Sequence, residues 1–305
     1  MSLGRNHYKS RSELQLYSKE LALTLYVRSG GHDKHDGLSL ERSVQTLGRA
    51  ISLCPEKSDR AIIIDVGPGE WEEDITIPPV RFFGSKKFSR SLCSRVGIEG
   101  HKTEQLGLII RGSPGPVQSS FFQYEVGKSF NPTPILSEDR IDGNIYNYFY
   151  PSSKILGTVY TQPATTLELA TLEIGAVDKP YGVCSFGSII TAKGISFIRS
   201  QVGISAESFS DIRLSGCLFG NKVVHMKGRS SSIISVDNTH FSALKRFFEA
   251  QDRSFISISN SSLGGVGLTV GLDYSDIVIQ SLSNTTIVGD SGSIFKLTQV
   301  ASQGS

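Results

Sequence analysis

An internal repeat of twenty-two residues constrains the fold of this chain more than any other feature of its sequence. Between Cys184 and Leu272, columns of apolar or small residues recur at this spacing. A fixed period of this length is typical of stacked units that cannot bury their apolar sides alone. The columns are Ile190, Ile212, Ile234 and Ile256; Ala192, Leu214, Val236 and Ile258; Phe197, Phe219, Phe241 and Leu263; Ile204, Met226, Phe248 and Val270; and Cys184, Ala206, Gly228, Ala250 and Leu272.

Within each repeat the apolar residues alternate with polar ones, which is the period of a strand with one buried face. Twenty-two extended residues span at most roughly 70 Å, which suits one three-sided coil. Coils stacked about 4.8 Å apart would pair each strand with the strands above and below. The sequence therefore predicts an all-β parallel β-helix. A leucine-rich repeat is the alternative, but the return segments 201–206 and 267–272 alternate as strands do.

The composition fits such a solenoid and excludes several classes of function. Hydrophobic residues make up 38% of the chain, and the 31 glycines suit many tight corners around a thin core. A net charge of +2 argues against a nucleic-acid partner held by bulk charge. The sequence has no long apolar run and no signal-peptide pattern, so we expect synthesis in a cytoplasm and no membrane insertion. The four cysteines lack metal-binding or disulfide spacing, and we expect buried thiols and no cofactor.

The chain divides into four predicted segments. Residues 1–22 form an arm, 23–111 a capping helix and the first coils, 112–166 an insertion, and 167–305 the regular coils with a C-terminal cap. In the second segment, Ser39 is predicted to cap a helix. Its apolar residues fall on one helical face. These residues are Leu40, Val44, Leu47, Ile51 and Cys54.

The opening of the chain also carries a specific motif. It consists of Leu-Tyr-Val-Arg at 25–28, Gly-His-Asp-Lys-His-Asp-Gly-Leu-Ser at 31–39, and Ile-Asp-Val-Gly-Pro-Gly-Glu-Trp-Glu-Glu-Asp-Ile-Thr-Ile at 64–77. This resembles pectate-lyase-like right-handed parallel β-helix proteins, closest to those of tailed-bacteriophage tails and spikes. The resemblance covers residues 25–110 by motif and 167–297 by repeat. It implies a right-handed, single-stranded β-helix whose N-terminal helix shields the open strand edges of the first coil. It implies no particular activity.

The insertion at 112–166 breaks the repeat with six prolines and many aromatic residues. A segment of this length without regular pattern is usually functional or ordered by a partner. We expect it to contact a neighbouring protein, with a glycan or the flank of its own solenoid as alternatives. The aromatic residues predicted to make this contact are Phe121, Phe122, Tyr124, Tyr146, Tyr148 and Tyr150.

Candidate catalytic and metal-binding residues are weak. Hydrolysis of a polysaccharide needs paired carboxylates, and the columns of Asp211 and Asp237 hold no second acid in a neighbouring coil. We therefore expect no catalytic residue and no enzymatic activity. The cluster at 32–36 contains two histidines and two aspartates, so Asp33 and Asp36 are weak metal candidates. Turn formation is the favoured role for both, and we expect no bound metal.

One outward column is unusually apolar and predicts an interface between subunits. It lies one residue before the isoleucine column, and three of its first four members are apolar. We expect it to form the flank of a homotrimer, or else to lie beneath the insertion. Its last member turns inward if the final coil slips by one residue. The column consists of Ile189, Asp211, Ile233, Phe255 and Ile277.

These observations favour a non-enzymatic structural component of a phage particle, in the tail or baseplate. We expect a spike-like homotrimer that contacts other virion structural proteins, made in the host cytoplasm and located in the virion. The alternatives are a spike domain that binds or degrades a host surface glycan as a lyase or hydrolase, a capsid decoration protein, and a cytoplasmic interaction protein of the leucine-rich-repeat type.

Overall fold

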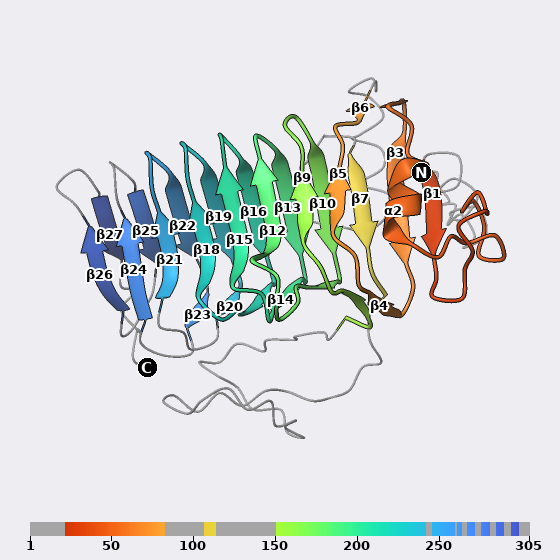
Figure 1. Ribbon diagram of the computed structural model, residues 1–305. Helices are drawn as coiled ribbons and strands as arrows, with labels where there is room; N and C mark the ends of the chain where they lie inside the picture. Colours follow the sequence, from red (N-terminus) through yellow and green to blue (C-terminus); the bar gives the residue numbers. More distant parts are fainter. Residues whose placement is uncertain are drawn as a thin grey trace, which may run out of the picture.

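The chain folds into a parallel β-solenoid whose coils stack along one axis (Figure 1). The computed structural model describes residues 22–82, 107–113, 151–241, 246–259, 261–263, 267–271, 276–280, 285–289 and 294–298. Over these ranges three long sheets run the length of the solenoid, with ten, seven and eight strands. Each strand inside these sheets pairs in parallel with strands of the coils before and after it, and the strands at the sheet ends have one such neighbour. The predicted all-β, parallel β-helix is therefore confirmed.

The coil visits the three sheets in a fixed order: ten-stranded, seven-stranded, eight-stranded. The ten-stranded sheet contains β1 (Ala22–Val27), β3 (Ala61–Val66), β7 (Leu108–Arg111), β10 (Thr166–Ala170), β13 (Ile189–Lys193), β16 (Asp211–Ser215), β19 (Ile233–Asp237), β22 (Phe255–Ser259), β25 (Asp276–Gln280) and β27 (Ile294–Thr298). The seven-stranded sheet contains β4 (Gly69–Trp71), β8 (Ser153–Ile155), β11 (Glu173–Ile174), β14 (Ser196–Ile198), β17 (Leu218–Gly220), β20 (His240–Phe241) and β23 (Ser262–Leu263). The eight-stranded sheet contains β5 (Ile75–Ile77), β9 (Val159–Thr161), β12 (Tyr181–Phe186), β15 (Val202–Glu207), β18 (Val224–Gly228), β21 (Arg246–Ala250), β24 (Gly267–Gly271) and β26 (Thr285–Gly289). Strands β2 (Lys57–Ser58) and β6 (Arg81–Phe82) pair separately.

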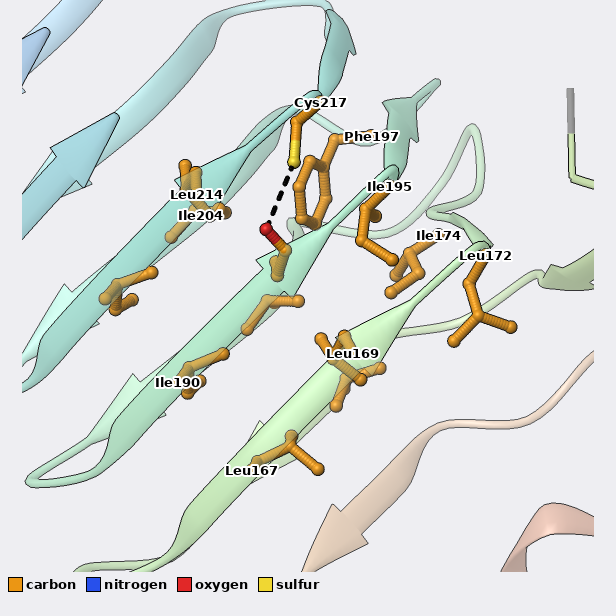
Figure 2. Close-up of a cluster of buried hydrophobic side chains, with 14 of the residues drawn as sticks. Leu167, Leu169, Leu172, Ile174, Ile190, Ile195, Phe197, Ile204, Leu214 and Cys217 are labelled. Carbon is orange, nitrogen blue, oxygen red and sulfur yellow. Dashed lines mark hydrogen bonds between the residues drawn. The ribbon is translucent and has the colours of Figure 1, made fainter. Parts of the chain in front are cut away.

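The core is built from columns of like residues, as the repeat predicts. Ile190, Ile212 and Ile234 pair in register and are buried. Figure 2 shows such side chains side by side from successive coils, with the Cys217 thiol directed at the carbonyl oxygen of Ala192, 3.6 Å away. The three stacked rings of Phe197, Phe219 and Phe241 have centroids 4.8 and 5.0 Å apart. This spacing matches the separation of strands in a sheet, so the backbone ladder and the aromatic stack reinforce each other.

The corner between the ten- and seven-stranded sheets uses left-handed backbone. The residues at this corner in four successive coils have φ values of 54°, 60°, 61° and 47°. Glycine adopts this conformation without steric cost, and asparagine tolerates it better than most residues. The sharp bend therefore explains part of the glycine content. The four residues are Thr171, Gly194, Gly216 and Asn238.

The register slips where the coil length changes. Ile277 pairs with Ile256 and is buried, so it belongs to the core column and the prediction that it faces outward is wrong. Asp276 takes the outward place above Phe255. Cys184 pairs with Ser205 and not with Ala206, so its assignment to the fifth column is also wrong. Each error arises because the step to the next coil is one residue shorter than the repeat at that place, which moves a side chain to the opposite face.

The predicted capping helix exists but is shorter than expected. Helix α2 (Leu47–Ser52) begins after Thr46, whose side chain accepts a hydrogen bond from the Arg49 amide. Ser39 instead accepts from the Arg42 amide in a local turn, and Leu40 is exposed. The helix lies at the N-terminal end of the solenoid and contacts β1 and β5 (Figure 1). It adds buried side chains to the core there, as a cap does.

The segment boundaries change accordingly. Strands β8 and β9 are ordinary members of the solenoid, so residues 151–166 belong to a coil and the predicted end of the insertion at 166 is too late. The six aromatic residues predicted to make the partner contact lie outside the described residues, as do residues 1–21 of the arm. In the part of the chain that is described, no helix is long and apolar enough to cross a membrane.

Candidate functional site

The outer surface of the eight-stranded sheet gathers charged and aromatic side chains in register. Along β12, β15, β18 and β21 the side chains alternate between core and surface, because successive residues of a strand point to opposite faces. The middle column of the surface is Tyr160, Cys184, Ser205, Lys227 and Glu249. Two residues further along each strand, a second column contains Phe186, Glu207, Arg229 and Gln251. We call these two columns together the eight-strand face.

A partly buried ion pair lies at the centre of the eight-strand face. Lys227 Nζ is 3.1 Å from Glu249 Oε1, and the two side chains are only 18% and 8% exposed. The Gln251 side-chain amide donates a second hydrogen bond of 2.7 Å to the same oxygen. Moving both charges out of water costs free energy, and the ion pair and the Gln251 hydrogen bond together offset part of that cost. The Glu249 carboxylate is therefore held in one position.

A second charged group lies beside the pair. The Ser205 hydroxyl donates to Glu207 Oε1 at 2.9 Å, and Ser205 itself is fully buried. Arg229 follows β18, and its Nε is buried with no hydrogen-bond partner among the described residues. Burial raises the pKa of the Tyr181 phenol, the negative charge of Glu207 adds to the rise, and Arg229 opposes it. Tyr181, Glu207 and Arg229 therefore lie close enough to influence one another.

The cysteine on this surface is not a nucleophile. Burial, with a contribution from Glu207, raises the pKa of the Cys184 thiol to about 12. A thiol with this pKa is protonated near neutral pH and reacts poorly. Cys54 and Cys217 have pKa values raised to about 12, chiefly by burial. The expectation of buried free thiols is confirmed for Cys184 and Cys217, whereas Cys54 is free but only partly buried, and Cys93 lies outside the described residues.

The weak metal candidates have local structural roles. Asp33 accepts hydrogen bonds from the amides of Gln45 and Thr46, at 2.8 and 2.9 Å, and so fixes the segment that leads into α2. Asp36 accepts from the Leu38 amide and pairs with Arg42 at 3.0 Å. Within the described ranges, no group of three or more histidine, cysteine or acidic side chains is placed to hold a metal ion.

Four of the five residues predicted to form a subunit interface share one outward column. Ile189, Asp211, Ile233 and Phe255 do form one outward column at the start of their strands. Ile233 is 45% exposed, whereas Ile189 and Phe255 are partly buried. Asp211 pairs within its own chain with Arg213 at 2.8 Å, so it does not need a partner's cation. Self-association through this column stays a prediction.

Comparisons with known proteins return structures and no sequence relatives. No protein-family model and no curated protein matches the chain. A pectin methylesterase from Aspergillus niger has a TM-score of 0.40 at 10% identity, covering 90% of this chain and 84% of that one. Pectin methylesterase PemA from Erwinia chrysanthemi has a TM-score of 0.39 at 12% identity, covering 87% and 80%. A pectin methylesterase in complex with a hexasaccharide has a TM-score of 0.37 at 13% identity, covering 91% and 93%.

These comparisons correct one expectation. We expected a protein without enzymatic activity, but the solved structures that it resembles are enzymes, so that prediction is contradicted. At 10–13% identity the likeness shows the fold alone, and it assigns no substrate or residue. It gives no support to a phage origin. Glu249 lies on the eight-stranded sheet, outside the columns of Asp211 and Asp237 on the ten-stranded sheet. The twenty-two-residue step from Lys227 to Glu249 was a signal that could have revealed the eight-strand face.

Proposed function

We propose that the protein binds a linear acidic polysaccharide along the eight-strand face. The observation that carries this proposal is the in-register array of Glu207, Lys227, Arg229 and Glu249. These side chains come from three successive coils, those of β15, β18 and β21, whose strands lie about 4.8 Å apart. The array thus offers an extended polymer charged contacts of both signs along its length.

The preference for an acidic polymer follows from the two cations. Lys227 is already paired with Glu249, whereas the buried Nε of Arg229 has no partner in the described part of the chain. A guanidinium group binds a carboxylate through two parallel hydrogen bonds. A sugar carboxylate at Arg229 would satisfy the unpaired donor, and the neutral hydroxyls of the polymer would bond to Glu207 and Gln251.

Aromatic side chains supply the apolar part of the site. Tyr160 belongs to the middle column, the Tyr181 phenol lies within electrostatic range of Glu207 and Arg229, and Phe186 is 40% exposed at the end of β12. Carbohydrate sites commonly combine an apolar ring with a few oriented polar groups. Because each ring offers a flat apolar surface, it can pack against the C–H face of a sugar.

Binding can be tested by affinity electrophoresis and calorimetry with polygalacturonate, alginate and hyaluronate, with dextran as a neutral polymer. We expect an acidic polymer to bind and dextran not to bind. Arg229→Gln should weaken that binding about tenfold or more, which corresponds to the loss of one charged hydrogen-bond pair. Arg213→Gln on the ten-stranded sheet is the matched control and should bind like the wild type. Unchanged binding by Arg229→Gln, or tight binding to dextran alone, would refute the proposal.

A second candidate function is a structural role in a phage particle through self-association. It is favoured by exposed apolar side chains along the edge where the eight- and ten-stranded sheets meet, namely Phe186, Phe209 and Ile233. Flat flanks of three solenoids could close around one axis to form a trimer. Sedimentation should then detect a trimer at micromolar concentration, and Ile233→Lys should convert it to a folded monomer. A wild-type protein that sediments as a monomer would contradict free self-association.

A further inference from the structure

The charges of the eight-strand face change sign from one coil to the next. Its two cations, Lys227 and Arg229, lie on and just after β18. Glu207 ends β15 in the coil before them, and the Arg229 amide donates at 2.8 Å to the carbonyl oxygen of Ala206, which sets Arg229 beside Glu207. Glu249 pairs in register with Lys227 in the coil after them. Strands of successive coils lie about 4.8 Å apart, so the two cations have a carboxylate one coil away on each side.

Both carboxylates are held in place by neighbouring side chains. The hydroxyl of the fully buried Ser205 donates to Glu207 Oε1 at 2.9 Å. Lys227 Nζ and the Gln251 amide hold Glu249 Oε1 at 3.1 and 2.7 Å. A ligand on this face therefore meets two negative charges whose positions are set by the protein.

One of the two cations is already engaged within the chain. Lys227 is only 18% exposed and pairs with Glu249. Arg229 is partly exposed, and its buried Nε has no hydrogen-bond partner in the described part of the chain. Both Arg229 and Glu207 act on the pKa of the Tyr181 phenol, in opposite directions, which is consistent with their common neighbourhood. The face thus offers a ligand carboxylate one place, at Arg229, with fixed carboxylates in the coils on both sides.

This pattern restricts a polymer that lies along the solenoid axis. A sugar ring in an extended chain is about as long as the coil spacing of about 4.8 Å. When one sugar places its carboxylate at Arg229, the sugars before and after it therefore lie in the coils of Glu207 and Glu249. A second carboxylate at that spacing would be repelled, which weakens binding by about fourfold in bulk water and by more at a partly buried site. A neutral sugar there can instead donate its hydroxyl protons to the fixed carboxylate.

We propose that the eight-strand face selects acidic polysaccharides in which neutral sugars separate the carboxylates. Glu207 and Glu249 are the residues that determine this specificity, because they repel a polymer with a carboxylate on every sugar. Specificity of this kind depends on a repulsive contact with the wrong ligand as well as an attractive contact with the right one. The inference rests on the proposed binding function and names the class of polymer that the same face takes.

The first experiment compares two hexasaccharides of equal length by calorimetry. Hyaluronate alternates a sugar that carries a carboxylate with a neutral one, whereas polygalacturonate carries a carboxylate on every sugar. We expect the hyaluronate hexasaccharide to bind at least about tenfold more tightly, since the other ligand meets a fixed carboxylate on both sides of Arg229.

The variant Glu207→Gln tests the residue assigned to this selection. It keeps a side-chain oxygen that can accept the Ser205 hydrogen bond, but it removes the negative charge. The ratio of the two affinities should therefore fall at least about fourfold. Glu168→Gln, which removes a charge beside Lys193 on the ten-stranded sheet, is the matched control and should leave the ratio unchanged. Circular dichroism verifies that both variants fold.

The wild-type protein provides a test that needs no variant. Repulsion between partly exposed charges is screened as the screening length falls from about 10 Å at 0.1 M salt to about 3 Å at 1 M. The preference for the hyaluronate hexasaccharide should shrink over this range. A preference that is independent of salt would contradict an electrostatic origin.

The outcomes separate this inference from the proposed binding function. If the polygalacturonate hexasaccharide binds as tightly as the other or more tightly, the selection is refuted and the binding function stands. A ratio that Glu207→Gln leaves at the wild-type value also refutes the inference, because the charge of Glu207 then plays no part. If neither the hexasaccharides nor the acidic polymers bind, both proposals fail.

Discussion

The interior and the outer faces of the solenoid share one register but follow opposite rules. Inside, each coil places a residue on a similar one, as in the Phe197, Phe219 and Phe241 stack. Outside, neighbouring coils place unlike residues together, as in Ser205, Lys227 and Glu249. Identical apolar groups pack well at the strand spacing, whereas identical charges would repel each other there. A repeat therefore identifies the core directly, while a functional surface must be found by looking for unlike residues at the same spacing.

The largest effect that tests this comparison is the loss of one ring from the aromatic stack. Phe219→Ala should lower the free energy of unfolding by about 3–5 kcal/mol, because the fully buried ring leaves a cavity between Phe197 and Phe241. Chemical denaturation measures the change. Phe186→Ala is the matched control, because this ring is exposed on an outer face, and it should cost less than about 1 kcal/mol. A loss below about 1 kcal/mol for Phe219→Ala would show that the stack is not what stabilises these coils.

Most of the fold could be predicted from the sequence, because the core places similar residues in the same position of successive coils. The spacing of the isoleucine and phenylalanine columns predicted the register between β13 and β22, and the structure confirms it. The spacing alone could not decide which face Ile277 takes. A coil that is one residue shorter than the repeat moves the residue at the expected position to the opposite face. The length of α2 was overestimated, since Asp33 and the turn around Ser39 replace its first turns.

The charged clusters on the outer faces, including the candidate site, were harder to predict, for two different physical reasons. Lys227 and Glu249 lie one repeat apart, so the eight-strand face could have been found by extending the search to every outward column. Glu70 and Lys154 are adjacent in the seven-stranded sheet but 84 residues apart in the chain. The intervening segments have no repeat, so no spacing rule indicates which residue of the later coil meets Glu70. Only the three-dimensional register brings Glu70, Lys154 and Glu173 into one column.

A smaller effect compares two ion pairs on different outer faces. Lys227→Met removes the cation that pairs with the nearly buried Glu249 carboxylate, and we expect a loss of about 2 kcal/mol, moderated by Gln251. Arg213→Met breaks the Asp211 pair, whose side chains are 56% and 28% exposed, and should cost less than about 0.5 kcal/mol. Both changes are measured by denaturant unfolding near neutral pH.

The double variant decides whether the pair itself is responsible for the loss at Lys227. Glu249→Gln added to Lys227→Met also removes the carboxylate charge that Lys227 balanced, so it should recover part of the lost stability. A double variant no more stable than Lys227→Met alone would indicate that the Lys227 methylenes, and not its charge, stabilise this surface.

The smallest expected effect is an increase in stability, and it concerns Glu173. Because burial raises its pKa in the folded protein, its contribution to stability is full below the pKa of an ordinary glutamate, about 4.5, and is lost as pH rises through the folded value. Above that pH the wild type carries a charge that folding disfavours, whereas Glu173→Gln does not. The variant should therefore be more stable than the wild type by up to about 1 kcal/mol near neutral pH. The difference should vanish at pH 4.

The matched control is Glu168→Gln, at a partly exposed side chain beside Lys193, and it should show no such gain. If Glu173→Gln were less stable than the wild type at neutral pH, the charges of Arg199 and Lys154 would outweigh the effect of burial on Glu173.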